Sequence, residues 1–249
     1  VGDNEDAFPN DAKFHVELTD YYPLGNAISG NNPIPVEGFP NGRHEWFGHS
    51  VAMNADGTII AAGAYKNSEV QSSSGAVRVF RNLNGDWVQM GEDLLGSDVG
   101  EAFGSSVSLN SVGNVLAVGC YNATPQGSPS SQIGNVKVYQ FDDMSETWQQ
   151  IGSDIHGDGG HKDWSGWKTV LNGDGTIVAI GAFHSSLNGD RAGYVKVYEL
   201  VEGTWNQLGD TIVGQQPLNR IGYTLDLDEL GYTLAIGSDV RNAVDVYML

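Results

Sequence analysis

The stretch "GHSVAMNADGTIIAAGA", residues 48–64, decides the fold, because three further copies of it follow along the chain. The other copies begin at Gly104, Gly166 and Gly222, and all four align over seventeen residues without a gap. Their starts lie 56, 62 and 56 residues apart, a period typical of propellers and solenoids. The repeat therefore predicts four similar structural units.

Each copy predicts a β-hairpin followed by two more strands. The alternating residues 50–53 lead into an Asn-Ala-Asp-Gly turn, in which Gly57 can take a positive φ, and the small apolar run "TIIAAGA" follows. A valine-rich strand begins near Gly75 ("GAVRVFRNL"), and a fourth strand begins at Trp87 ("WVQMGEDLLG"). No 3.6-residue period persists long enough for a helix. The predicted fold class is all-β, with four-stranded antiparallel blades.

The expected domain is a single four-bladed β-propeller over residues 1–249. Its blades are predicted at about 46–102, 103–163, 164–220, and 221–249 plus 14–30. The last copy has no tryptophan strand, whereas "YYPLGNAISG" (residues 21–30) matches that strand with Tyr21 in the tryptophan place. An N-terminal strand that completes the last blade would hide exposed sheet edges. The alternative is a piece of a longer array or larger propeller, whose ends are arbitrary.

Several segments resemble the FG-GAP repeats of integrin α-subunit propellers, among them "FGHSVAMNADG" from Phe47 and "FGSSVSLNSVG" from Phe103. The chain is also similar to Trp-x-Gln-x-Gly repeat arrays in secreted proteins of diatoms and other marine microbes. The FG-GAP resemblance implies a Ca²⁺ site in the first hairpin, built from Asp-x-Asp-x-Asp-Gly-x-x-Asp. The ligand positions of the first repeat are instead Ala52, Asn54, Asp56 and Ile60. No hairpin keeps the full Ca²⁺ ligand set, so we expect its Asn and Asp residues to form turns and predict no firm cofactor.

The charge of the chain restricts its partners. It carries 31 acidic and 12 basic residues, for a net charge of −19, which would repel nucleic acid and anionic lipid. No apolar run approaches the roughly 20 residues of a membrane span, so membrane insertion is not expected. The single Cys120 is predicted to be a buried core thiol. The sequon at Asn122 favours a secreted protein or one in an organelle lumen.

Candidate binding residues lie in the loops where the repeats differ, which the strand directions place on one face. The candidates are His44, Trp46, His156, Asp158, His161, Asp163, Trp164, His184, Arg191 and Arg220. Weak metal candidates are His156, Asp158, His161 and Asp163, since imidazole and carboxylate suit Zn²⁺. A polar loop with solvated histidines is the alternative. Exposed tryptophans at positions 46 and 164 would stack on sugar rings or on a partner's side chains.

No nucleophile elbow, P-loop or His-Glu-x-x-His motif occurs, and no catalytic residue is predicted. The expected function is a non-catalytic binding or scaffolding module that presents the loop face to a protein or glycan. One alternative is a carbohydrate-active enzyme or lectin with an axial pocket. The other is an accessory subunit of a larger assembly, which would show a sizeable apolar patch.

Overall fold

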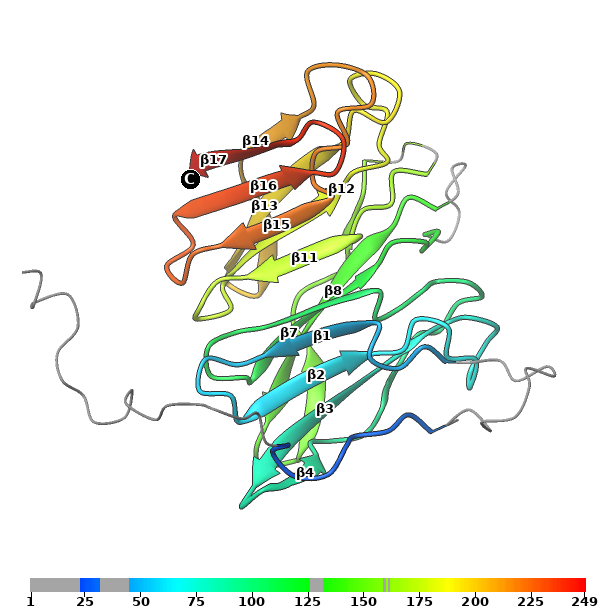
Figure 1. Cartoon of the computed structure of the whole chain (residues 1–249), viewed down its shortest axis with the longest axis vertical. Helices are drawn as coiled ribbons and strands as arrows, with labels where there is room; N and C mark the ends of the chain where they lie inside the picture. The colour runs from blue at the N-terminus through cyan, green and yellow to red at the C-terminus, as the bar shows by residue number, and fades with distance from the viewer. Residues whose placement is uncertain (1–22, 32–44, 126–131, 159, 161) are drawn as a thin grey trace, which may run out of the picture.

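The computed structural model describes residues 23–31, 45–125, 132–158, 160 and 162–249. Within these ranges all regular secondary structure is β-strand, and seventeen strands form four antiparallel sheets. The sheets are arranged as the four blades of a β-propeller (Figure 1), which confirms the predicted all-β class and its blade architecture. No helix in the described ranges is long and apolar enough to cross a membrane.

The strand bounds follow the repeat. Blade 1 contains β1 (Ser50–Met53), β2 (Ile59–Gly63), β3 (Ala76–Leu83), β4 (Asp86–Gln89) and β5 (Leu94–Leu95). Blade 2 contains β6 (Ser106–Leu109), β7 (Val115–Cys120), β8 (Asn135–Asp142), β9 (Thr147–Gln150) and β10 (Ile155–His156). Blade 3 contains β11 (Lys168–Leu171), β12 (Ile177–Ala182), β13 (Tyr194–Val201) and β14 (Thr204–Val213). Blade 4 contains β15 (Thr224–Leu227), β16 (Thr233–Ser238) and β17 (Ala243–Met248).

The recurring turn between the first two strands is closed by an amide side chain in blades 1 to 3. Asn54 Oδ1 accepts the N–H of Ile59 at 2.9 Å, and Asn110 and Asn172 do the same for Val115 and Ile177. Gly57 in the first of these turns has a φ of 75°, which glycine adopts without steric cost. The Asn residues at positions that bind calcium in FG-GAP repeats are therefore turn formers, as expected.

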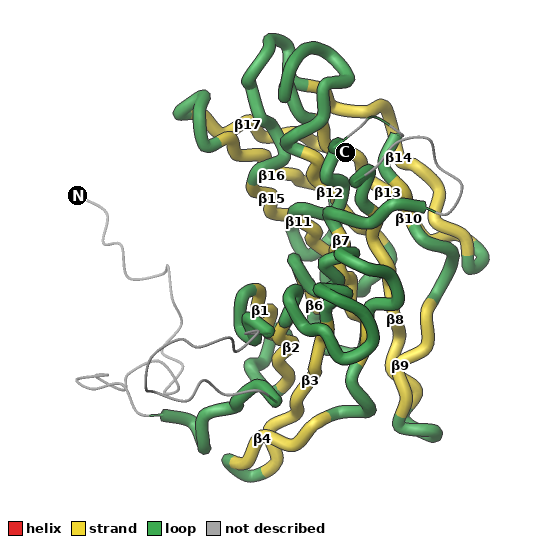
Figure 2. The backbone as a smooth tube through the Cα atoms, turned by 90° about the vertical axis from the view of Figure 1, so that its right-hand side faces the viewer, coloured by secondary structure: helices red, strands yellow, loops and turns green. Residues whose placement is uncertain are grey.

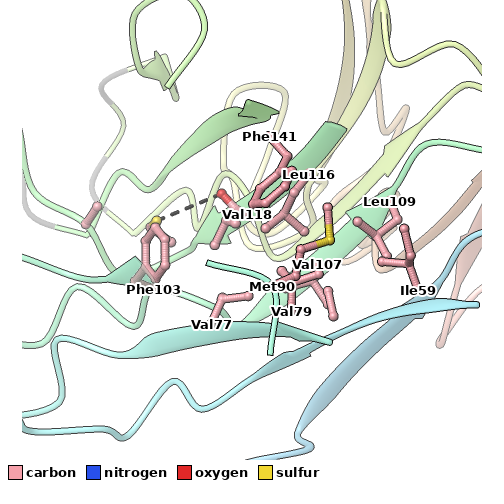
Figure 3. Close-up of a cluster of buried hydrophobic side chains, with 13 residues drawn as sticks. Ile59, Val77, Val79, Met90, Phe103, Val107, Leu109, Leu116, Val118 and Phe141 are labelled. Carbon is pink, nitrogen blue, oxygen red and sulfur yellow. Dashed lines mark hydrogen bonds between the residues drawn. The ribbon is translucent and has the colours of Figure 1, made fainter. Parts of the chain in front are cut away.

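Each pair of neighbouring blades encloses its own apolar core. Val77 and Val79 of blade 1 pack on Val107 and Leu116 of blade 2, as Figure 3 shows. The second strands β7 and β12 are buried along their whole length, which confirms the interpretation of their small apolar sequence as strands covered on both faces. Cys120 is fully buried in this first core, also as predicted.

The blades follow one another along an arc. Figure 2 shows blade 1 and blade 4 at its two ends. The first strands β1, β6, β11 and β15 contact one another in series. Alternate side chains of a first strand, such as Val107 and Leu109, face the preceding blade. The alternating valines of a third strand, such as Val136 and Val138, face the following blade.

An indole hydrogen bond joins each tryptophan strand to the segment before it. Trp148 Nε1 donates to the carbonyl oxygen of Met90 in blade 1 at 2.8 Å, and Trp205 Nε1 donates to Ile151 in blade 2 at 3.0 Å. Trp87 Nε1 of blade 1 donates to the carbonyl of Leu24 at 2.8 Å. Leu24 thus occupies, relative to blade 1, the place that Met90 occupies relative to blade 2.

The prediction that residues 14–30 complete the last blade is wrong for the part of that segment that the structure describes. Residues 23–31 lie against blade 1, where the N–H of Asn31 donates to Glu45 Oε1 at 2.7 Å. The last sheet has three strands, with β17 at its edge. The physical reason is that blades 1 and 4 lie at opposite ends of the arc (Figure 2), so a strand bound to blade 1 does not reach β17. Tyr21 lies outside the described residues.

In each of the first two blades, a buried carboxylate that precedes the first strand binds a cation on the third strand. Glu45 accepts hydrogen bonds from Arg78 Nη1 at 3.1 Å and from Asn67 Nδ2 at 2.8 Å. Burial acts to raise the pKa of Glu45, but the hydrogen bonds from Arg78 and Asn67 and the charge of Arg78 outweigh it and hold the pKa below its ordinary value. In blade 2, Glu101 accepts from Lys137 Nζ at 2.7 Å. These links fix the start of each blade, where the binding candidates lie.

Candidate functional site

Long connections and short turns lie at opposite ends of the blades. The pairing of Ser50 with Gly63 and of Met53 with Ile60 puts the turn at residues 54–58 at one end of blade 1. The connection from β2 to β3 and the entry into β1 lie at the other end. The same register holds in blades 2 to 4. This loop face contains the candidates that precede each first strand.

A continuous row of aromatic side chains runs across the loop face of all four blades. The members of this aromatic band are Trp46, His49, Tyr65, Tyr121, Trp164, Trp167, Phe183, His184 and Tyr223. They come from two repeat positions around the first-strand glycine and from the residues that follow the second strand. Because these positions recur in each blade, the propeller itself aligns the rings.

The band begins at blade 1 and crosses to blade 2. The Trp46 ring meets Tyr65 edge-on with centroids 5.4 Å apart, and His49 lies 4.5 Å from Tyr65. Tyr65 then lies 6.4 Å from Tyr121 of blade 2. Trp46 is 52% exposed, which confirms its predicted exposure.

The centre of the band is densest at blade 3. Trp164 stacks on His184 with centroids 4.2 Å apart and on Trp167 at 5.9 Å, and it meets Tyr121 of blade 2 edge-on at 5.4 Å. Trp167 in turn meets the buried Phe183 at 4.8 Å. Trp164 and His184 are half-buried, and among the described residues the buried Nε1 of Trp164 has no hydrogen-bond partner.

The last blade ends the band with a cation. The guanidinium of Arg220 lies 4.7 Å from the Phe183 ring centroid and 5.4 Å from that of Tyr223, within range of a cation–π contact. Arg220 also pairs with Asp239 at 2.8 Å. Beside it lies a hollow of about 470 Å³ whose lining includes Tyr223, Asp239 and Val244.

Burial disfavours the charged form of four titratable rings of the band. Burial lowers the pKa of His49, and burial together with nearby positive charge lowers the pKa of His184. Burial likewise raises the pKa of Tyr65 and of Tyr121. At the blade 4 end of the band, the charged side chain that touches its rings, among the residues that the structure describes, is Arg220.

Two of the band's side chains and the adjoining Arg220 share a backbone conformation that glycine usually takes. Trp46, Trp164 and Arg220 occupy the same repeat position and have φ values of 57°, 57° and 48°. A left-handed φ at a non-glycine residue costs of order 1–3 kcal/mol and clusters at functional sites. Ala102 at the same position of blade 2 has a φ of 61°, so the repeat sets this backbone conformation and the identity of the side chain does not.

The metal candidates have other partners. Asp158 forms an ion pair with Lys196. Asp163 is buried and accepts the N–H of Gly160 at 3.1 Å, and burial raises the pKa of its carboxyl. His156 is exposed on β10, on the outer strand of blade 2. Among the residues that the structure describes, no three His, Cys, Asp or Glu side chains come together as a metal site.

The remaining candidates are placed as follows. His184 Nδ1 lies 2.9 Å from the carbonyl oxygen of Lys162. Arg191 is exposed in the connection between β12 and β13. His44 and His161 lie outside the described residues. The structure therefore gathers Trp46, Trp164, His184 and Arg220 along one band. It does not gather His156, Asp158 and Asp163, the metal candidates that lie within the described ranges.

Sequence reasoning missed six members of the band, namely His49, Tyr65, Tyr121, Trp167, Phe183 and Tyr223. A signal for them exists in the repeat alignment. Tyr65, Tyr121 and Phe183 are the residues that follow the last small residue of the second strand, and the column after the first-strand glycine contains Trp167 and Tyr223. Aromatic residues in one column of a repeat predict neighbouring rings in space.

No protein-family model and no curated protein sequence matches the chain. Solved structures resemble it in fold. A putative 6-phosphogluconolactonase from Bacteroides uniformis has a TM-score of 0.54 at 15% identity over 80% of this chain and 50% of its own. Sqt1 of Saccharomyces cerevisiae has a TM-score of 0.50 at 16% identity over 83% of this chain and 46% of its own. The chain thus spans about half the length of the solved structures it matches, and the likeness supports the propeller fold alone.

Proposed function

We propose that the chain is a binding module whose aromatic band is the contact surface for a ligand. The observation that carries this proposal is the band itself, because it runs unbroken across all four blades and includes a half-exposed tryptophan, Trp46. Tryptophan and tyrosine dominate the energetics of protein interfaces. Their flat rings cover a large area, and the indole N–H or phenol O–H can form a hydrogen bond with the partner.

The ligand that best fits the band is a neutral glycan chain. Burial disfavours charge on His49, His184 and two of the tyrosine rings, and the net charge of −19 disfavours anionic polymers. An extended row of rings suits a repeating ligand, since each sugar can present its apolar face to one aromatic side chain. The runner-up is a protein surface with a matching aromatic or basic patch.

The test is binding of the full chain to an array of neutral glycans, including β-glucan, xylan, mannan and chitin oligosaccharides. Trp46→Ala and Trp164→Ala are the test variants. Loss of an anchoring tryptophan costs at least about 2 kcal/mol, which weakens binding roughly thirtyfold. Met144→Ala is the matched control, because Met144 is 95% exposed in the hairpin between β8 and β9, away from the band.

Retained binding in both tryptophan variants would contradict the band as the contact surface. If the chain bound no glycan on the array, a neutral glycan would be excluded as the ligand. The same variants would then be tested for binding to displayed protein partners. Release of reducing ends from a bound oligosaccharide would favour the alternative of a carbohydrate-active enzyme.

A further inference from the structure

The two ends of the arc expose faces that are buried at every internal junction. In blades 2 to 4 the apolar side chains of the first strand that face the preceding blade are buried, for example Val107, Leu109 and Leu225. At the same positions in blade 1, Val51 is 71% exposed and Met53 is 60% exposed. Blade 1 therefore presents an unpaired junction face, the head face, defined by Val51 and Met53.

Blade 4 presents the complementary half of such a junction. The alternating valines of the third strand are buried in blades 1 to 3, where they pack on the next blade. The equivalent residues on β17, Val244 and Val246, are each 67% exposed. This tail face, defined by Val244 and Val246, has the composition of the surface that receives a first strand elsewhere in the chain.

The strand inventory of the two ends is complementary as well. Residues 23–31 sit on blade 1 as a fourth strand of a preceding blade would, since Leu24 takes the indole hydrogen bond of Trp87 and Asn31 binds Glu45. Blade 4 has no fourth strand among its described residues. The groove there, lined by Ile212, Val213 and Tyr247, measures about 590 Å³, against about 270 Å³ at the equivalent place beside Trp205.

The segment also fits β17 in chemistry. In blades 1 and 2 the third-strand cation pairs with an aspartate of the fourth strand, as Arg78 does with Asp93 at 2.7 Å. Blade 4 has Asp245 at the cation position, and the segment has Ala27 at the aspartate position, so no like-charge contact arises.

Pro23 in the segment is compatible with the same place. It corresponds to Gln89, whose N–H points away from β3 because Met90 N donates to the Val79 carbonyl at 2.8 Å and the hydrogen bonds alternate. Proline is tolerated in an edge strand where its missing N–H would face solvent.

We propose that a second copy of this chain packs head to tail on the first. Val51 and Met53 of one copy lie on Val244 and Val246 of the other, and residues 23–31 of the first copy become the fourth strand beside β17 of the second. A heterologous contact of this kind closes into a ring when its rotation permits. Because the four blades match about half of the solved propellers, two copies complete one ring with two equivalent junctions.

The test is the mass of the full chain by sedimentation velocity and light scattering across the micromolar range. The expected species is a dimer of twice 26.6 kDa. Val51→Lys or Val246→Glu alone buries an unpaired charge at both junctions and should weaken the dimer at least about a hundredfold. An equimolar mixture of the two variants should form a dimer again, because one junction then pairs Lys with Glu and the other is unchanged.

Val201→Lys is the control, since Val201 is 45% exposed at the end of β13 outside both faces, and it should leave the dimer intact. Val51→Lys and Val246→Glu replace exposed side chains, and circular dichroism checks that these two variants fold. A wild-type chain that stays a monomer of 26.6 kDa at every concentration would overturn the proposal. The same monomer mass would be found if the two ends of one copy packed on each other. A dimer that survives both single variants, or a mixture that stays monomeric, would also overturn it.

Discussion

The indole hydrogen bonds between blades give the sharpest prediction about stability. Trp148→Phe keeps an aromatic ring against Phe141, whose centroid lies 5.2 Å from that of Trp148, and removes the N–H that reaches the Met90 carbonyl. Met90 is buried, so its carbonyl loses a partner that water replaces poorly. A buried polar group left without a partner costs about 1–3 kcal/mol.

The expected loss of unfolding free energy for Trp148→Phe is therefore about 2 kcal/mol. For a domain of this size it corresponds to a fall in Tm of about 4–8 °C. Trp87→Phe is the matched control, because it removes the same N–H from the carbonyl of Leu24, a residue that is 61% exposed. Water can replace that bond, so the loss should be about 0.5 kcal/mol or less.

The assay is urea unfolding followed by far-UV circular dichroism and by fluorescence, with the midpoint compared among the wild type, Trp148→Phe, Trp205→Phe and Trp87→Phe. The order of destabilisation should follow the burial of the accepting residue, with Trp148→Phe the largest and Trp87→Phe the smallest. Equal effects for Trp148→Phe and Trp87→Phe, or a loss below about 0.5 kcal/mol for Trp148→Phe, would refute the role of the indole bond as a link between blades.

Three further predictions concern single groups. Glu45→Gln removes the charge that faces the buried Arg78 and should cost about 3–5 kcal/mol at pH 7. Because the folded pKa of Glu45 is lowered, the difference from the wild type in urea melts should shrink as pH falls below the ordinary value of 4.5, and a constant difference would contradict it. The pKa values of His184 and His49 are lowered in the folded state, so the unfolded chain binds more protons below about pH 6.5 and stability should fall as pH drops from 7 to about 5. The double variant His49→Gln/His184→Gln should flatten this fall in thermal melts, and an unchanged slope would exclude these histidines as its cause. Burial raises the pKa of Cys120 well above its ordinary value, so a thiol reagent should label the native chain only as fast as the core between blades 1 and 2 unfolds. Rapid labelling without denaturant would contradict this, because it would show that the reagent reaches the core of the folded chain.

The repeat in the sequence is sufficient to predict the fold of each blade. The spacing of the four copies and the small apolar second strand indicate the sheets, and β7 and β12 are buried as that composition requires. The curvature of the whole array is not predictable in this way. It depends on how side chains such as Val77 and Phe103 pack between blades, and local patterns contain no measure of that angle. The predicted closure of the last blade by residues 14–30 failed at this step.

The candidate site was only partly predictable for a related reason. Trp46 and Trp164 stand out because they precede a first strand in a variable loop. Tyr65 and Tyr121 follow buried strands, and their sequence context resembles that of core residues. Asp158 seemed a metal candidate until the structure showed its ion pair with Lys196, a partner 38 residues away in the chain.

The most direct test of the binding surface uses the indole N–H signals of the six tryptophans in a ¹⁵N-labelled full chain. Three of them, Trp87, Trp148 and Trp205, donate hydrogen bonds between segments, and the other three belong to the aromatic band. Titration with the glycan oligosaccharide that binds best on the array should shift the signals of Trp46, Trp164 and Trp167 and leave the other three in place. Shifts confined to Trp87, Trp148 and Trp205 would contradict the assignment of the band as the ligand-binding surface.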